Sequence, residues 1–265
     1  MTKINSMSIV SQGAVLADDV EIGPFCTIGP NVVIGSGTKI LGHCNITGHT
    51  TIGKNNLIFN FVSMGTWPQD HGFKGLVSYL RVGDDNIFRE GFTANIGTKE
   101  GSETVIGSHC YFMSNTHVAH NCKVGNGVIM VTASGLAGYT ELGDKCLISG
   151  LSGTHQFVKV GRLAMISGGS VTSVNIPPFV IAEGRNGAVK TLNLVGLKRN
   201  GFSVEVIAEL KKMFKIFFKS NLNVSNAIKR IRGEVKLIPE VQEFIDFVET
   251  SKRAVAHGRE IGRRL

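Results

Sequence analysis

Residues 15–53 read VLADDVEIGPFCTIGPNVVIGSGTKILGHCNITGHTTIG, and an aliphatic residue recurs in this stretch at every sixth position, often with glycine directly after it. A period of six fits neither an α-helix nor an alternating β-strand. It is typical of a parallel β-helix, in which each hexapeptide contributes one short strand and one corner and buries the aliphatic side chain. Across the chain, the series comprises Val10, Leu16, Ile22, Ile28, Ile34, Ile40, Ile46, Ile52, Ile58, Met64, Val82, Phe88, Ala94, Ile106, Phe112, Val118, Val124, Met130, Leu136, Leu142, Ile148, Thr154, Val160 and Ile166.

The position four residues after each aliphatic one is also restricted, because nearly all of its occupants are small. We expect the cysteines, which all fall on it, to be small buried core side chains rather than a metal cluster or a disulfide framework. Free core thiols are typical of a reducing compartment, so we expect a cytoplasmic protein. The cysteines are Cys26, Cys44, Cys110, Cys122 and Cys146.

Composition limits the function classes. The first residues, MTKINSMSIV, lack the long apolar run of a signal peptide, and we expect no transmembrane segment in the chain. The net charge of +8 fits either a solvated basic surface or an acidic partner, such as nucleotide phosphates or an acidic carrier protein. Nucleic acid is not expected as a partner, because the chain has no basic–aromatic binding motif.

Two inserted loops interrupt the rhythm, one near residues 65–81 and the other near residues 98–104. Eighteen residues separate Met64 from Val82, so the first insert is predicted to replace about one coil without shifting the phase. Loops that project from a rigid solenoid commonly carry binding residues. The first insert contains Asp70, His71 and Lys74, which favour a functional loop over a neutral surface excursion.

The six-residue pattern fades after Ile166, and helical patterns follow. Ser203 is suited to be an N-cap before a first amphipathic helix, and later apolar residues indicate two or three more helices, punctuated by Gly233 and Pro239. We predict a hexapeptide-repeat β-helix over residues 1–190 and a C-terminal α-helical domain over residues 191–265. The basic tail, KRAVAHGREIGRRL, fits a solvated end or a membrane-surface segment.

Histidines supply the candidate chemistry. His117 and His120 lie on adjoining hexads at neither inward position, and His155 and Gln156 follow two coils later. Residues eighteen apart stack in regular coils, so His120, Gly138 and Gln156 are predicted to form a column. Such a histidine is either an ordinary surface residue or a general base, since the ordinary pKa of histidine lies near neutrality.

Five segments together resemble the UDP-N-acetylglucosamine O-acyltransferases of lipid A biosynthesis: HVAHNC, LAGY, THQF, PPFVIAEG and NLVGLKRNGFS. The resemblance spans almost the whole chain. It implies a left-handed parallel β-helix, a homotrimer and active sites in clefts between subunits. It also implies that a 3-hydroxyacyl chain passes from acyl carrier protein to the 3-hydroxyl of UDP-N-acetylglucosamine. The donor is then the carrier's phosphopantetheine thioester, with no bound cofactor and no metal.

The same resemblance implies a role for each site residue. His120 becomes the general base, and the Gly138 N–H stabilises the oxyanion. His117 lies near the pantetheine arm, and Gly168 lies where the acyl chain extends. The residues implied to hold the sugar nucleotide are Asp70, His155, Gln156 and Asn193, with Arg199 at its phosphate or uridine end and Tyr139 beside the substrate.

The chain departs from the family pattern at several of these places. Tyr139 stands where the family usually has histidine, Asn121 where it has aspartate and Val195 where it has glutamate, and the lysine two residues after Asp70 is missing. These changes concern the acceptor pocket more than the general base. They favour two alternatives: a paralogue that acylates a variant UDP-amino sugar, and a catalytically weak, binding-only paralogue.

Two other enzymes of similar architecture fit the sequence less well. A γ-class carbonic anhydrase needs three well-placed histidines for its zinc, and it lacks a long helical tail. An N-acyltransferase of the same pathway is expected to carry an additional N-terminal nucleotide-binding domain, whereas the hexads here begin at Val10.

Overall fold

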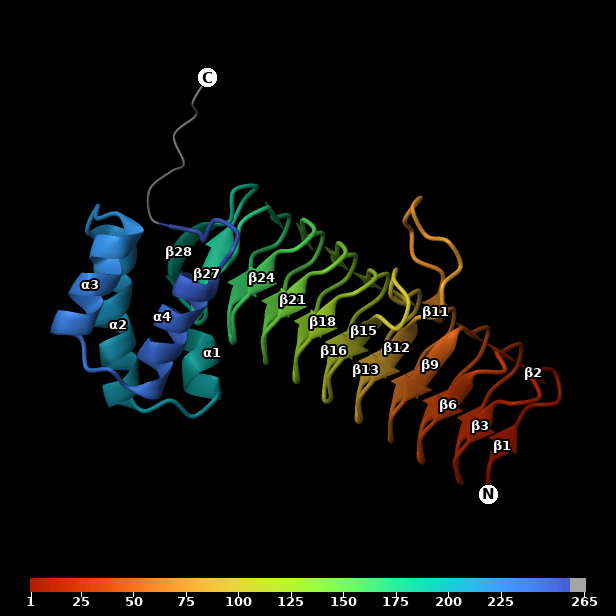
Figure 1. Cartoon of the computed structure of the whole chain (residues 1–265). Helices are drawn as coiled ribbons and strands as arrows, with labels where there is room; N and C mark the ends of the chain where they lie inside the picture. The colour runs from red at the N-terminus through yellow and green to blue at the C-terminus, as the bar shows by residue number, and fades with distance from the viewer. Residues whose placement is uncertain (258–265) are drawn as a thin grey trace.

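The computed structural model, which describes residues 1–257, is a solenoid of three β-sheets with four helices packed at one end (Figure 1). Consecutive strands fall on successive sheets, so each sheet takes every third strand of the solenoid. Neighbours in a sheet pair in parallel, typically with partners eighteen residues apart, as Glu21 pairs with Lys39. The part of the basic tail from residue 258 onward lies outside the described residues.

The strands are short, and most contain two residues. The eleven-stranded sheet contains β1 (Lys3–Ile4), β4 (Glu21–Ile22), β7 (Lys39–Ile40), β10 (Leu57–Ile58), β13 (Ile87–Phe88), β16 (Tyr111–Phe112), β19 (Ile129–Met130), β22 (Leu147–Ile148), β25 (Met165–Ile166), β27 (Val180–Glu183) and β28 (Ala188–Leu192). The nine-stranded sheet contains β2 (Ile9–Val10), β5 (Thr27–Ile28), β8 (Asn45–Ile46), β11 (Ser63–Thr66), β14 (Thr93–Asn95), β17 (His117–Val118), β20 (Gly135–Leu136), β23 (Gly153–Thr154) and β26 (Val171–Thr172). The eight-stranded sheet contains β3 (Val15–Leu16), β6 (Val32–Ile34), β9 (His49–Ile52), β12 (Tyr79–Val82), β15 (Glu103–Ile106), β18 (Lys123–Val124), β21 (Glu141–Leu142) and β24 (Lys159–Val160).

The core is the stack of inward side chains predicted from the period of six. From β4 to β25 the second residue of each two-residue strand is buried, and the first is exposed or half-buried. All five cysteines are buried and free, which confirms their expected place in the core. Burial raises the pKa of the Cys122 and Cys146 thiols to about 12, so these two groups remain protonated and unreactive near neutral pH.

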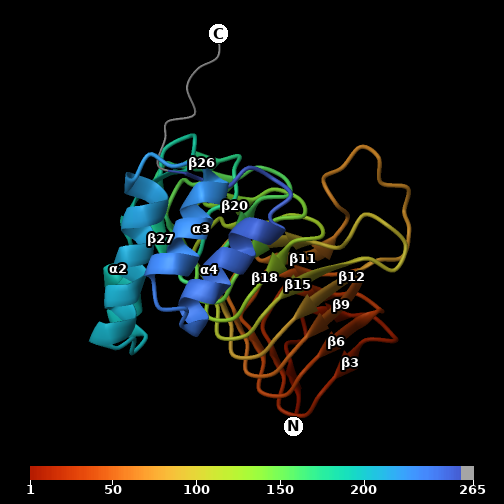
Figure 2. The ribbon, with the colours of Figure 1, turned by 60° about the vertical axis from the view of Figure 1, so that its left-hand side comes forward.

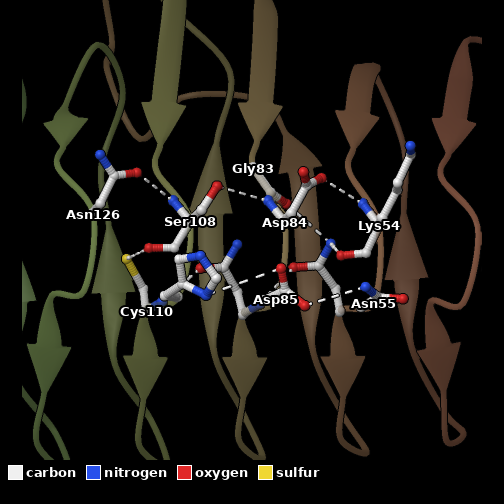
Figure 3. Close-up of polar contacts among 11 residues, drawn as sticks. Lys54, Asn55, Gly83, Asp84, Asp85, Ser108, Cys110 and Asn126 are labelled. Atoms are coloured by element: carbon white, nitrogen blue, oxygen red, sulfur yellow. Dashed lines mark hydrogen bonds and ion pairs between the residues drawn. The ribbon is translucent and has the colours of Figure 1, made fainter.

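The corners are joined from coil to coil by polar side chains. At the corner shown in Figure 3, the Asp84 carboxylate accepts the Lys54 N–H at 2.6 Å, and the Ser108 hydroxyl accepts the Asp84 N–H at 2.9 Å. Asn126 in turn accepts the Ser108 N–H at 2.9 Å. Backbone donors at a turn have no partner in the strand ladder, so the side chain of the next coil satisfies them.

The first insert lengthens a coil and does not replace one, so the prediction of a replaced coil was wrong. Val82 pairs with Ile52, thirty residues earlier, which leaves twelve extra residues in one otherwise complete coil. Because twelve is a multiple of six, the phase of the hexads after the insert is the same whether the insert lengthens a coil or replaces one. The excursion spans residues 67–78 and projects from the solenoid beside β11 (Figure 1).

The second insert lies against the first. It spans residues 96–102, and the paired strands on either side lie twenty-four residues apart, as in the pair of Ala94 with Val118. The Val77 carbonyl accepts the Gly101 N–H at 2.8 Å, and Glu100 accepts the Val77 N–H at 3.1 Å. Figure 2 shows the two loops together on one side of the solenoid.

The four helices follow the antiparallel pair β27–β28 and are α1 (Leu194–Arg199), α2 (Val204–Lys219), α3 (Val224–Glu234) and α4 (Pro239–Thr250). Ser203 is the N-cap of α2, as predicted, and its hydroxyl accepts the Val206 N–H at 3.3 Å. Gly233 lies inside α3 and does not end it, whereas Pro239 begins α4. Among the described residues, no helix is both long enough and apolar enough to cross a bilayer.

An ion pair ties the helices to the last coils. Arg162 donates to both carboxylate oxygens of Glu243 on α4, from Nε at 3.1 Å and from Nη2 at 2.7 Å. Two-pronged contacts of this kind fix orientation as well as distance. The helical bundle is therefore held at a defined angle to the solenoid.

Replacing a core ring should destabilise the solenoid far more than replacing a surface ring. Phe112 is fully buried, and its ring stacks on that of Phe88 with centroids 5.0 Å apart, so Phe112→Ala leaves a cavity. We expect a loss of about 3–5 kcal/mol in the free energy of unfolding, measured by denaturant titration. Phe25→Ala is the matched control, because 53% of that side chain is exposed. Equal losses in the two variants would contradict the assigned core.

Candidate active site

His120 follows β17 at a corner, and its imidazole lies directly against the backbone of Gly138 in the next coil. A methyl group placed on the Gly138 Cα would lie 2.5 Å from Nε2 of His120 and 3.0 Å from its Nδ1. The parallel register of β17 with β20 brings the two coils together, as expected for residues eighteen apart. His120 is only 5% exposed, although it lies at neither inward position, because the absent side chain of Gly138 lets the ring fold onto the next coil.

His117 lies on β17 itself, one strand position before the buried Val118. Its Nδ1 is 2.7 Å from the Thr93 hydroxyl on the neighbouring strand β14. Burial lowers the pKa of the His117 imidazole, and the nearby His120 lowers it further. His117 is therefore disposed to be neutral, with Thr93 beside one of its ring nitrogens.

An aromatic pair continues the column away from His120. The Tyr139 ring meets the His120 ring edge to face, with centroids 5.4 Å apart, and stacks on Phe157 at 4.7 Å. The Gly138 carbonyl accepts the Phe157 N–H at 3.0 Å, which joins these coils through the backbone. His155 is exposed beside Phe157, and its Nδ1 lies 3.3 Å from the Gln156 carbonyl.

The remaining predicted site residues lie elsewhere in the chain. Asp70 is exposed in the projecting loop of residues 67–78, where its carboxylate accepts the Gly72 N–H at 2.8 Å. Arg199 is exposed in the last turn of α1 at the helical end of the solenoid (Figure 1). Gly168 is also exposed, and a methyl group there would meet only the Gly150 carbonyl, at 3.6 Å.

Asn193 is the N-cap of α1. Its side-chain oxygen accepts the Gly196 N–H at 2.9 Å, and its amide nitrogen donates to the Leu163 carbonyl at 2.9 Å. These bonds fix where α1 leaves the solenoid, and hence where Val195 and Arg199 lie. In the described chain, Asp70, Asn193 and Arg199 make no hydrogen bond or ion pair with His120.

A hollow of about 680 Å³ lies beside Asn121, Tyr139 and Phe157. Lys123 and Lys159 also line it, whereas His120 does not. Asn121, Tyr139 and Phe157 directly follow His120, Gly138 and Gln156, so the residues next to the predicted column form one wall of this hollow. Within residues 1–257, no set of three histidine, cysteine, aspartate or glutamate side chains is arranged to hold a metal ion.

A hexapeptide solenoid with a buried histidine packed against a glycine fits a hexapeptide-repeat acyltransferase, and comparison with known families agrees. Residues 13–48 match the bacterial transferase hexapeptide repeat. Residues 175–256 match the second domain of UDP-N-acetylglucosamine O-acyltransferase. The chain belongs to the UDP-N-acetylglucosamine O-acyltransferase family, as its sequence motifs indicated.

Individual relatives are similar over nearly their whole length. The chain is 46% identical over 259 residues to an acyl-[acyl-carrier-protein]–UDP-N-acetylglucosamine O-acyltransferase of Trichlorobacter lovleyi, covering 96% of this chain and 99% of that one. It is 43% identical over 256 residues to the enzyme of the same name from Thiobacillus denitrificans, with the same coverage. The crystal structure of a UDP-N-acetylglucosamine acyltransferase from Bacteroides fragilis matches with a TM-score of 0.92, at 38% identity over 95% of this chain and 99% of that chain. The fold is therefore the left-handed parallel β-helix that the resemblance implied.

Sequence reasoning missed two threonines that touch the site. Thr93 contacts His117, and Thr98 contacts both Asn121 and Tyr139. The strand pairing of β14 with β17 would have indicated Thr93 if the length of the second insert had been known. Thr98 lies inside an insert, where the period of six gives no register, so no sequence signal pointed to it.

A side chain at Gly138 should displace His120. We expect Gly138→Ala to rotate the imidazole away from its present position and to lower the free energy of unfolding by about 1–3 kcal/mol, because the added methyl overlaps the ring. A crystal structure and a denaturant titration of the variant would measure both effects. Gly135→Ala is the matched control, since a methyl there approaches only the His117 Cβ, at 4.0 Å. An unmoved His120 ring in Gly138→Ala would refute the packing described here.

The pH response of His117 offers a separate test. We expect its imidazole to titrate below the ordinary histidine pKa of about 6.5, because burial disfavours the cation. Below about pH 6.5 the His117 imidazole of the unfolded chain binds a proton more readily than that of the folded protein. The free energy of unfolding therefore falls as the pH drops below about 6.5. Histidine-selective ¹⁵N NMR, assigned with His117→Gln, would give the midpoint. That variant should lose less stability than wild type between pH 7.5 and 5.5. A midpoint at or above the ordinary value would contradict the burial argument.

Proposed function

We propose that this chain transfers a 3-hydroxyacyl group from acyl carrier protein to the 3-hydroxyl of UDP-N-acetylglucosamine, with His120 as the general base. Membership of the family supports the reaction class, and relatives above 40% identity are named acyl-[acyl-carrier-protein]–UDP-N-acetylglucosamine O-acyltransferases. The observation that carries the catalytic assignment is the placement of the His120 imidazole against Gly138, where no side chain separates the ring from the next coil. Histidine is the commonest general base in enzymes, because its ordinary pKa lies near working pH.

The proposed reaction needs one base and one donor. Nε2 of His120 takes the proton from the sugar 3-hydroxyl, and the oxygen attacks the thioester carbonyl. The carbonyl oxygen becomes an oxyanion, which accepts the Gly138 N–H. The C–S bond then breaks, and the phosphopantetheine thiolate leaves with the proton from His120. In support, the Gly138 N–H donates to no protein acceptor within residues 1–257, so it is free to serve the substrate.

We assign the sugar nucleotide to Asp70, His155, Gln156, Asn193 and Arg199, and the acyl chain to the open face at Gly168. Three parallel pairings separate β17 from β26, which is about 14 Å along the solenoid at ordinary strand spacing. The projecting loop follows β11, on the far side of β17, and α1 lies beyond β26. The projecting loop with Asp70 and the helix with Arg199 therefore lie far apart on one chain. A homotrimer with shared clefts, as the resemblance implies, would bring such residues of neighbouring subunits together.

The proposed macromolecular partner is acyl carrier protein. The chain carries a net charge of +8, and α2 presents exposed lysines at positions 211, 212 and 215. An acidic carrier would be attracted to such a surface by long-range electrostatics. We place the protein in the cytoplasm, a location supported by its five free core cysteines.

A variant acceptor is the second candidate, and Val195 is the observation that favours it. Its side chain is 59% exposed on α1, at the position where the family usually has a glutamate that contacts the nucleotide. An amine in place of the 3-hydroxyl would yield an amide rather than an ester, with the same base. A binding-only paralogue would yield no product at all. Product mass therefore separates the three cases.

Loss of the base should abolish most of the activity. With UDP-N-acetylglucosamine and 3-hydroxyacyl carrier proteins of several chain lengths, we expect an acylated sugar nucleotide, detected by mass spectrometry. His120→Ala should lower kcat by about 10²–10⁴-fold. His109→Ala is the control, because this histidine lies exposed at the polar corner beside Asp85. Undiminished transfer by His120→Ala would refute the base assignment. If folded wild-type protein gave no product with UDP-N-acetylglucosamine or with its 3-amino counterpart, the proposed reaction would be refuted.

A further inference from the structure

Hydrogen bonds join His120, through the adjacent Asn121, to Thr98 and Tyr139 in other parts of the chain. Its Nδ1 lies 3.1 Å from the side-chain oxygen of Asn121. The same oxygen lies 3.0 Å from the backbone nitrogen of Thr98 and 2.9 Å from its hydroxyl. The Thr98 hydroxyl in turn lies 2.9 Å from the Tyr139 hydroxyl. Thr98 belongs to the second insert, whereas Asn121 and Tyr139 occupy left-handed corner positions, at φ of 59° and 61°, in successive coils.

The hydrogens in this network can be assigned one at a time. A backbone N–H only donates, so the Asn121 atom that faces Thr98 is the oxygen and not the amide nitrogen. That oxygen only accepts, so the Thr98 hydroxyl must give it its single hydrogen. The Tyr139 hydroxyl must then donate to Thr98. By the same reasoning, Nδ1 of His120 carries a hydrogen and donates it to Asn121.

This assignment has a direct consequence for the proposed base. A neutral imidazole carries one hydrogen, so a hydrogen on Nδ1 leaves the lone pair on Nε2. Nε2 is the ring nitrogen nearer to Gly138, since a methyl group there would lie 2.5 Å from Nε2 and 3.0 Å from Nδ1. If the Asn121 amide were turned by 180°, its NH₂ group would face Nδ1 and favour the other tautomer, which has no lone pair on Nε2. The orientation of this one amide therefore decides whether Nε2 of His120 can accept a proton.

We propose that Thr98 is a positioning residue, which acts through Asn121 to hold His120 in the tautomer with hydrogen on Nδ1. Its N–H and its hydroxyl both require the oxygen of Asn121, and Tyr139 holds the hydroxyl in the donating orientation. The proposal rests on the proposed function, because it gives His120 the form that a general base needs. Thr98, Asn121 and Tyr139 bring no charged partner to His120, so orientation alone maintains the tautomer.

The test separates the hydroxyl from the rest of the residue. Thr98→Val keeps the backbone N–H and the side-chain shape but loses the hydroxyl, whereas Thr98→Ser restores it. In histidine-selectively ¹⁵N-labelled protein, with the His120 signals assigned by their absence in His120→Gln, we expect wild type and Thr98→Ser to show hydrogen on Nδ1. In Thr98→Val only the backbone N–H still holds the Asn121 oxygen, so the amide is held less firmly and we expect a mixture of tautomers. The kcat of this variant should fall about tenfold with little change in KM, the scale of one lost hydrogen bond.

Two results would overturn the proposal. One is a wild-type His120 with its hydrogen on Nε2. The other is a Thr98→Val protein that keeps both the pure Nδ1 tautomer and the wild-type kcat. The melting temperature of Thr98→Val, compared with that of Thr98→Ser, shows whether a lost activity reflects unfolding. The tautomer is measured without substrate, so a failure of the proposed reaction would leave this result intact and would be recognised separately.

Discussion

The solenoid depends on one repeated burial event, an aliphatic side chain that enters the interior every sixth residue. Each such side chain contributes about 1.5–3 kcal/mol when fully buried, and the parallel ladders hold successive coils in a fixed register. Stacking then places residues eighteen apart in contact wherever no insert intervenes. The closeness of His120 and Gly138 follows from this register, because they occupy the same corner of neighbouring coils. The site is therefore built on the most rigid feature of the molecule.

The corners contain the unfavourable backbone conformations of this architecture, and they also contain the candidate active-site residues. Many corner residues other than glycine adopt left-handed backbone angles, among them Asn55, Asp85, Asn121 and Tyr139. Asparagine and aspartate tolerate this conformation best, because their short polar side chains bond to nearby backbone. At one corner two such side chains join coil to coil, where the Asn55 amide donates to the Asp85 carboxylate at 3.2 Å (Figure 3). At the corner of His120, Asn121 instead directs its oxygen to a histidine and to a loop.

Two of the departures from the family pattern, Asn121 and Tyr139, belong to one connected group in space. Asn121 and Tyr139 lie one coil apart in sequence position, and Thr98 bridges them. A carboxylate buried beside a histidine would stabilise the imidazolium, but it would also carry a desolvation cost. An amide orients the ring through the same oxygen without that cost and without the charge. Tyr139 fits this neutral arrangement, since it supplies a hydrogen to Thr98 and an aromatic edge to His120.

The period of six was enough to predict the β-helix, the buried cysteines and the contact of His120 with Gly138, because all three depend on local repetition. The motifs were enough to identify the family. Whether the first insert replaces a coil or lengthens one was not predictable, since twelve extra residues leave the phase of the hexads unchanged. The Thr98–Asn121–Tyr139 network was also out of reach, because it joins a loop outside the repeat to corners 23 and 41 residues away. Similarly, the capping role of Asn193 depends on the Leu163 carbonyl thirty residues before it. Contacts set by the repeat can be read along the chain, whereas contacts between an irregular loop and the repeat exist only after folding brings them together.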